Sequence, residues 1–256
     1  MSCGHEKNTP YSIEAYQGHI QRKKLLLLGV FLLVLVLMIL SLGAGSTKLS
    51  PREIIHTLFS AEQTKARIIV WKLRLPRVIA ALVAGWGLSI SGCVMQTCLG
   101  NPLASPSTLG LSQGAIFGAN LAILLFGAGT LQHTGGDALV LNSPYLVTIC
   151  AFAFAMLSTV MILSLARLRH FSKESIVLSG VALGSLFAAA TTILQYFSTD
   201  VRIAAALFWS FGDLGRIVWK ELLILTAVVV PISVFYYLQR WSYNALLTGE
   251  DTAKTL

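Results

Sequence analysis

Long apolar blocks alternate with short polar connections along most of this sequence. A helix needs about 20 residues to cross the roughly 30 Å hydrocarbon core of a bilayer, and each block approaches or reaches that length. We therefore predict an all-α fold, a polytopic transmembrane helical bundle with six spans. The predicted spans are residues 25–44, 78–99, 109–126, 145–166, 176–197 and 222–238.

The composition also indicates a membrane protein. Of the 256 residues, 55% are hydrophobic and 12% are charged, whereas a typical soluble domain has about 25% charged residues. The first apolar block resembles a signal peptide, but it lacks a small-residue cleavage site and further spans follow it, so we expect it to be retained. The net charge of +8 comes mainly from cations in the short connections. This placement fits membrane topology, and no nucleic-acid partner is expected.

Three cations, Arg22, Lys23 and Lys24, directly precede the first span. They predict a cytoplasmic tail at residues 1–24, because positive residues beside the first span usually decide its orientation. Residues 45–77 would then lie outside, although they hold seven cations: Lys48, Arg52, Lys65, Arg67, Lys72, Arg74 and Arg77. Counted over the whole chain, the cations divide almost equally between the two sides. Either the orientation is reversed, or this connection keeps its cations for another purpose.

None of the six blocks contains Asp, Glu, Lys, Arg or His. Ion-coupled transporters usually carry ionisable residues within the membrane, so this pattern disfavours a secondary transporter. It also disfavours an enzyme, because acid–base catalysis needs titratable groups. The four cysteines form no CxxC pair and the histidines are scattered. We therefore expect no metal site and no cofactor.

The second predicted span is rich in small residues. The pairs Gly85 with Ser89 and Gly87 with Ser91 have the spacing that allows close packing of helices in lipid. A compatible interpretation is that this helix, with little side-chain bulk, lines a wide pathway. Two prolines in residues 100–110 then prevent one continuous helix and predict a tight cytoplasmic turn. The residues that we assign to the translocation pathway are Gly85, Ser89, Gly92, Gln96, Asn101 and Pro102.

Four stretches of the sequence resemble a known family. Residues 74–120, "RLPRVIAALVAGWGLSISGCVMQTCLGNPLASPSTLGLSQGAIFGAN", are similar to the signature of permease subunits of ABC importers for ferric siderophores, haem and cobalamin. Residues 174–189, 208–215 and 244–256 are similar as well. The resemblance implies ten transmembrane helices per subunit, a second permease subunit in a homodimer or heterodimer, cytoplasmic ATPase subunits and an extracytoplasmic substrate-binding protein.

The resemblance also implies a role for the crowded cations. In that family the arginines of the R-L-P-R motif face outward and pair with acidic residues of the binding protein, a role that falls here to Arg74 and Arg77. A guanidinium group suits this role, because it is planar and rigid and can form bidentate hydrogen bonds with a carboxylate. Without the resemblance, the same side chains are expected to snorkel at the bilayer edge. The family often has acidic residues after its N-P-L-A turn, whereas this chain has Ser105 and Ser107.

Residues 241–256 resemble the start of the cytoplasmic coupling segment. The residues assigned to ATPase coupling are Asn244, Leu247, Gly249, Glu250 and Asp251. Thr248 and Asp251 have the spacing of a capping box, which predicts that a new helix begins there. The sequence ends shortly afterwards, whereas the resembling proteins continue through further spans. We therefore expect the first part of a permease that is truncated, split between two chains or incomplete.

The function predicted from these features is that of a permease subunit in an ATP-driven importer of an iron chelate, in the cytoplasmic membrane of a prokaryote. A ferric siderophore is favoured, with haem or cobalamin as alternatives, and the expected mechanism is alternating access. No GxxxxGK[ST] motif occurs in the chain, so ATP hydrolysis is expected in a separate subunit. The alternative is a non-transporting membrane-embedded remnant or an assembly scaffold. A secondary transporter ranks third.

Overall fold

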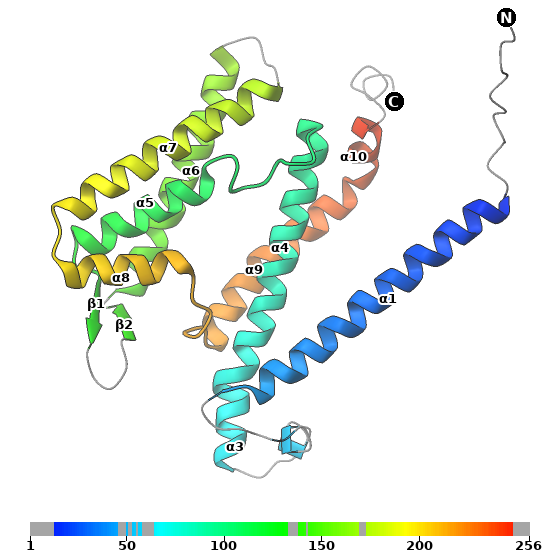
Figure 1. Cartoon of the computed structure of the whole chain (residues 1–256), viewed down its shortest axis with the longest axis horizontal. Coiled ribbons are helices and arrows are strands. Elements are labelled where there is room, and N and C mark those ends of the chain that lie inside the picture. Colours follow the sequence, from blue (N-terminus) through cyan, green and yellow to red (C-terminus); the bar gives the residue numbers. More distant parts are fainter. Residues whose placement is uncertain are drawn as a thin grey trace, which may run out of the picture. The chain divides into compact units, whose positions relative to one another are not determined.

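The computed structural model describes residues 13–45, 50, 53–54, 56–57, 64–132, 138–141, 143–168 and 173–247. Helices make up most of these residues, as the ribbon in Figure 1 shows. The chain divides into two compact units, Met1–Ile79 and Ala80–Leu256.

The first unit contains one long helix and the start of another. Its elements are α1 (Ile13–Gly43), α3 (Lys65–Ile68) and the π-helical turn η1 (Ile69–Arg74), after which α4 begins at Leu75. Leu42, Ile54 and Val78 form a small buried apolar cluster. Burial of these side chains holds the end of α1 against the start of α4, because removing apolar surface from water or polar surroundings is favourable.

The second unit contains the rest of α4 and all later elements. They are α4 (Leu75–Leu99), α5 (Leu111–Leu124), β1 (Gly129–Gln132), β2 (Ala138–Leu141), α6 (Pro144–Leu168), α7 (Lys173–Tyr196), α8 (Asp200–Phe211), α9 (Trp219–Leu238) and α10 (Arg240–Leu247). The two strands form an antiparallel pair in which Gly129 lies opposite Leu141 and Gln132 lies opposite Ala138.

A helix lies at each of the six predicted spans. Five helical segments are long and apolar enough to cross a membrane: Gln17–Gly43, Lys65–Leu99, Pro144–Arg167, Lys173–Tyr196 and Trp219–Leu238. The sixth, α5, is apolar but has only 14 residues. These helices confirm the predicted polytopic helical fold.

Two features were not predicted. The 12-residue helix α8 is too short to cross a bilayer, and a search for long apolar blocks passes over it. The hairpin of β1 and β2 has strands of 4 residues each, which give too little alternation for a reliable strand pattern. The hairpin follows the C-terminal end of α5, and α8 follows the C-terminal end of α7.

Helix α5 is the centre of the second unit and packs against α6, α7 and α8. Its buried residues Ala119, Ala122 and Ile123 form the main apolar cluster, together with Val147 from α6 and Ala205 and Ala206 from α8. Small side chains dominate this cluster, as they do where helix backbones approach closely in membranes. A side chain at Gly118 would overlap the carbonyl oxygen of Cys150 on α6. Glycine at this position therefore lets α5 and α6 meet backbone to backbone.

Many apolar side chains are exposed within this single chain. Helix α1 is the extreme case, with residues from Leu25 to Leu40 mostly exposed. A soluble protein rarely leaves such a large apolar surface uncovered. The exposed faces are suited to contact with lipid or with other membrane helices.

Candidate functional site

The R-L-P-R motif lies where the π-helical turn η1 changes into the α-helix α4. The backbone N–H of Leu75 donates a hydrogen bond to the carbonyl oxygen of Val70, five residues before it. Pro76 has no N–H, and in an α-helix its ring crowds the carbonyl group four residues earlier. The wider π-helical turn directly before Pro76 makes room for that ring. Turns of this kind are frequent at functional sites.

Arg74 points into the protein and is only 7% exposed. Its Nη1 donates hydrogen bonds to the carbonyl oxygens of Leu42, at 2.6 Å, and Gly43, at 3.2 Å. These carbonyls belong to the last turn of α1, where no backbone N–H of the helix is left to bond them. A cation also interacts favourably with the negative end of a helix. Arg74 therefore caps α1.

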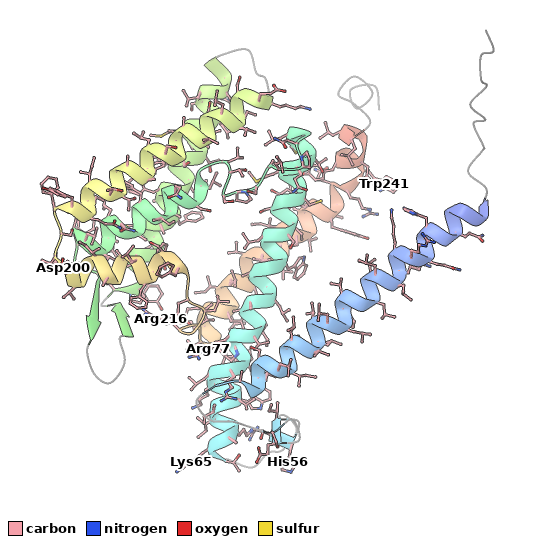
Figure 2. The ribbon with its side chains drawn as sticks, viewed as in Figure 1. His56, Lys65, Arg77, Asp200, Arg216 and Trp241 are labelled. Carbon is pink, nitrogen blue, oxygen red and sulfur yellow. The ribbon has the colours of Figure 1, made fainter. Side chains whose placement is uncertain are left out.

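Arg77 differs from Arg74 in its surroundings. It lies in the first turn of α4, where Figure 2 labels it. Its side chain is half-buried. Its Nε is buried and has no hydrogen-bond partner among the described residues. The outward docking role predicted for both arginines stays a prediction. Of the two side chains, only that of Arg77 reaches the surface of its unit to a substantial extent.

The predicted pathway residues of α4 share one face of the helix. Gly85, Ser89, Gly92 and Gln96 follow each other at intervals of four, three and four residues, which places them in one stripe. An added Cβ would meet nothing within 4 Å at Gly85 or Gly92. The hydroxyl of Ser89 donates to the carbonyl of Gly85 at 2.7 Å, so its polarity is satisfied within the helix. Within the described residues, Gly85, Ser89 and Gln96 are exposed and Gly92 is half-buried.

Asn101 and Pro102 lie in the turn after α4, beside a cavity. The cavity has a volume of about 640 Å³ and is lined by Leu99, Asn101, Pro102, Lys173, Glu174 and Val177, among others. Asn101 is fixed locally, because its Oδ1 accepts a hydrogen bond from the N–H of Leu103 at 2.9 Å. The structure thus brings two of the predicted pathway residues to the start of α7, a neighbour that the sequence did not indicate.

Ser105 and Ser107 make a compact polar turn within residues 100–110. Their hydroxyl oxygens are 2.9 Å apart, and the N–H of Ser105 donates to the hydroxyl of Thr108 at 2.9 Å. These hydrogen bonds stabilise the turn itself. The hydrogen bonds of the Ser105 and Ser107 hydroxyl groups among the described residues stay within this turn.

The predicted coupling residues are only partly described. Asn244 and Leu247 are exposed on α10, whereas Gly249, Glu250 and Asp251 lie outside the described residues. Tyr243 anchors this helix, and its ring centroid is 6.0 Å from that of Tyr236 on α9. Burial, and to a lesser extent the nearby Cys98 and Tyr236, raises the pKa of the Tyr243 phenol above its usual value.

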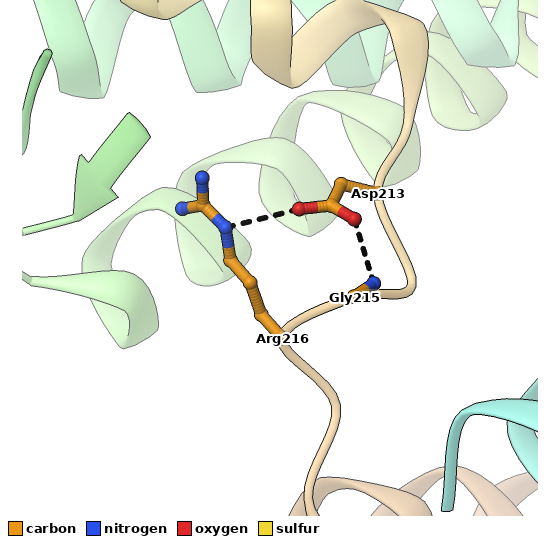
Figure 3. A network of polar contacts seen from close by, with 3 residues as sticks. All are labelled: Asp213, Gly215 and Arg216. Carbon is orange, nitrogen blue, oxygen red and sulfur yellow. Dashed lines mark hydrogen bonds and ion pairs between the residues drawn. The ribbon is translucent and has the colours of Figure 1, made fainter. Parts of the chain in front are cut away.

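The stretch similar to "FWSFGDLG" ends in a turn held by one carboxylate (Figure 3). Asp213 accepts a hydrogen bond from the N–H of Gly215 at 2.6 Å and another from Nε of Arg216 at 3.2 Å. This Asp213–Arg216 pair lies in the connection between α8 and α9. Both partners are substantially exposed, so the pair fixes the turn's shape more than it stabilises the fold.

Sequence reasoning did not assign a role to Arg202. Its Nη1 donates to the carbonyl oxygen of Leu124 at 2.9 Å and so caps the end of α5. The only signal in the sequence is a lone cation shortly after an apolar span. Within the described residues, no group of three or more His, Cys, Asp or Glu side chains is arranged to hold a metal ion.

Comparisons with known proteins agree with these features. The sequence matches the FecCD transport family over residues 17–256. It is 43% identical to a protein of Methanocaldococcus jannaschii named as an ABC transporter permease, over 91% of this chain and 67% of the relative. It is 37% identical to the vitamin B12 import system permease protein of Klebsiella pneumoniae, over 93% of this chain and 66% of the relative.

The chain is also similar to a solved transporter structure. That structure is described as a metal-chelate type ABC transporter in an inward-facing conformation, and its TM-score to this chain is 0.70 at 27% identity. The match covers 90% of this chain and 67% of the solved one. The chain thus spans about two thirds of the length of the relatives it matches.

Proposed function

The chain belongs to the FecCD transport family, and from this premise we propose that it is a permease subunit of an ATP-driven importer in the cytoplasmic membrane. It would provide part of the pathway for the substrate and would not hydrolyse ATP itself. The N-terminus would be cytoplasmic, as the cations before the first span predict.

The observation that carries this proposal is the stripe of Gly85, Ser89, Gly92 and Gln96 on α4. Three of its four residues are glycine or serine, three of the four are exposed, and none is charged. A helix face that only met lipid would have no need to exclude large apolar side chains. A face that borders a path for a bulky molecule does need this, because every added side chain narrows the path.

An iron chelate is the proposed substrate class, with a ferric siderophore favoured over haem or cobalamin. Support comes from the family and from relatives named for vitamin B12 import and for a metal-chelate transporter. All these molecules are large metal complexes. The chain would need only a wide pathway for them, because a binding protein can supply the selectivity.

Four partners complete the proposed importer. A second permease subunit, identical or related, would enclose the pathway, and lipid would cover the outer faces. An extracytoplasmic substrate-binding protein would dock on the side of Arg74 and Arg77. Cytoplasmic ATPase subunits would act through the segment that contains Asn244 and Leu247, followed by Gly249, Glu250 and Asp251.

The test is uptake in proteoliposomes that contain the permease with its ATPase and binding protein. Labelled ferric siderophore, haem and cobalamin would be compared, and the siderophore is expected to accumulate in an ATP-dependent way. Gly85→Trp should abolish uptake while the complex still assembles. Leu33→Trp is the control, because Leu33 on α1 is 56% exposed. Full uptake by Gly85→Trp would show that the stripe does not border the pathway.

A further inference from the structure

The end of α1 is held by a side chain from a later segment. Nη1 of Arg74 bonds the carbonyl oxygens of both Leu42 and Gly43, and these partners are 32 and 31 residues away in sequence. Leu42 is itself buried against Ile54. A buried guanidinium group requires such partners, because an unpaired charge away from water is strongly unfavourable.

Gly45 provides a second, independent observation at the same place. Its φ of +148° lies in a region that favours glycine. A Cβ at Gly45 would lie 2.6 Å from Nη2 and 3.1 Å from Cζ of Arg74. The atoms in the way belong to the end of a flexible side chain, so a residue larger than glycine would displace the guanidinium. The backbone at Gly45 is thus shaped to leave room for Arg74.

From these contacts we infer that Arg74 is a positioning residue, which fastens the end of α1 to the turn that carries Arg77. The charge of Arg74 is paired inside the protein, and of these two arginines only Arg77 presents a cation to a carboxylate of the docked binding protein. This inference rests on the proposed docking function. The motif suggests that both arginines dock the binding protein, whereas we assign docking to Arg77 and positioning to Arg74.

The positions of Arg74 and Arg77 explain how one can act through the other. Arg74 is the last residue of η1, and Arg77 lies three residues later, in the first turn of α4. One turn of helix therefore connects the capped end of α1 to Arg77. Loss of the cap frees the end of α1 and lets this turn move, which shifts Arg77 without removing its charge.

The test compares association of the binding protein with Arg77→Gln, Arg74→Gln and Gly45→Ala permeases over a range of ionic strength. An exposed charge that meets the partner sets the association rate and its salt dependence. Arg77→Gln is expected to lower the rate about tenfold at low salt and to flatten its salt dependence. Arg74→Gln and Gly45→Ala are expected to keep the wild-type salt dependence and to speed dissociation by similar factors.

Gly212→Ala is the matched control, because Gly212 also has a positive φ, +79°, but an added Cβ meets nothing within 4 Å. Hydrogen exchange of the amides in the last turn of α1 gives the structural readout. Faster exchange is expected in Arg74→Gln and Gly45→Ala, and no further increase in their double variant, because both break the same contact. Arg74→Lys should partly restore the slow exchange.

Two results would overturn the inference. One is a flattened salt dependence in Arg74→Gln equal to that in Arg77→Gln. The other is unchanged exchange at the end of α1 in both Arg74→Gln and Gly45→Ala. If Arg77→Gln does not alter association while exchange at α1 still increases in the other variants, the docking function fails and the cap stands.

Discussion

Asn120 on α5 and Gln195 on α7 are joined by a hydrogen bond, with Gln195 Nε2 donating to Asn120 Oδ1 at 3.1 Å. Asn120 is completely buried, and its own Nδ2 donates to the carbonyl oxygen of Ile116 at 2.9 Å. The amide of Asn120 thus has a partner on each side. In lipid, such links between helices specify which faces meet, because no water replaces a lost partner.

Asn120→Leu is expected to destabilise the helix bundle by about 1–2 kcal/mol, because it removes this bond and leaves the Gln195 amide without its partner. Unfolding in a detergent titration would measure the loss. Thr192→Ala is a suitable control, since Thr192 is exposed and its hydroxyl bonds the carbonyl of Ala188 in its own helix. A double-variant cycle with Gln195→Leu should give a coupling of about 0.6–1.7 kcal/mol. Additive losses would show that the bond contributes nothing.

Gly118→Ala should be among the most harmful single methyl additions in this chain. The new Cβ would overlap the carbonyl of Cys150 and lie 3.0 Å from the Cβ of Phe154, so the helices must separate. Overpacking of this kind costs about 1–3 kcal/mol. Gly92→Ala adds the same methyl group in open space and should be neutral or slightly stabilising, because alanine favours helix. Equal stabilities of the two variants, measured by thermal unfolding in detergent, would contradict the packing described.

The pKa of Glu53 is expected to lie below its usual value of 4.5. The N–H of Ser50 donates to Glu53 Oε2 at 2.7 Å, and the N–H of Glu53 donates to the Ser50 hydroxyl at 3.3 Å, the reciprocal pattern of a capping box. A lowered pKa stabilises the fold above the unfolded-state pKa, and the effect is lost as the pH falls through the folded value. A ¹³C NMR titration of the carboxyl would measure it. Ser50→Ala keeps the backbone N–H, which is the larger cause, and removes the hydroxyl, so it should raise the pKa only part of the way. A pKa of Glu53 at its usual value in the unaltered protein would rule out this cap.

Arg202→Gln should destabilise the second unit by about 1 kcal/mol, because the carbonyl oxygen of Leu124 loses its charged donor. Thermal unfolding in detergent is the measurement. Arg216→Gln removes a cation from a nearby exposed turn, where the pair with Asp213 is worth about 0–1 kcal/mol. A larger loss for Arg216→Gln than for Arg202→Gln would show that the cap on α5 is unimportant.

The apolar pattern predicted most of the fold, because burial in lipid demands long uncharged helices and these are visible in the sequence. The predicted first span begins at residue 25, whereas helix α1 begins earlier, at Ile13, because its polar first turns are helical but are not part of the apolar pattern. The short helix α8 was missed for the same reason. Its Ala205 and Ala206 pack in the cluster around α5, a tertiary contact that the sequence pattern does not show.

The candidate site was predictable only where one segment contains it. The stripe on α4 follows from spacing along a single helix. The two arginines of the R-L-P-R motif look equivalent in sequence, and their difference arises from Leu42 and Gly43, which lie more than 30 residues earlier. A local sequence pattern does not reveal a contact between residues so far apart in the chain. The cavity beside Asn101 likewise depends on the start of α7.

The backbone contact between α5 and α7 limits how the protein can move. An added Cβ at Gly110 would lie 2.6 Å from the carbonyl oxygen of Gly180 and 2.9 Å from the amide nitrogen of Gly184. Segments this close have no layer of side chains between them that could change rotamer and let them slide. During a transport cycle, α5, α6 and α7 should therefore travel as one rigid body. The hinges would then lie in the connections around that body, such as residues 100–108 and the turn at Asp213.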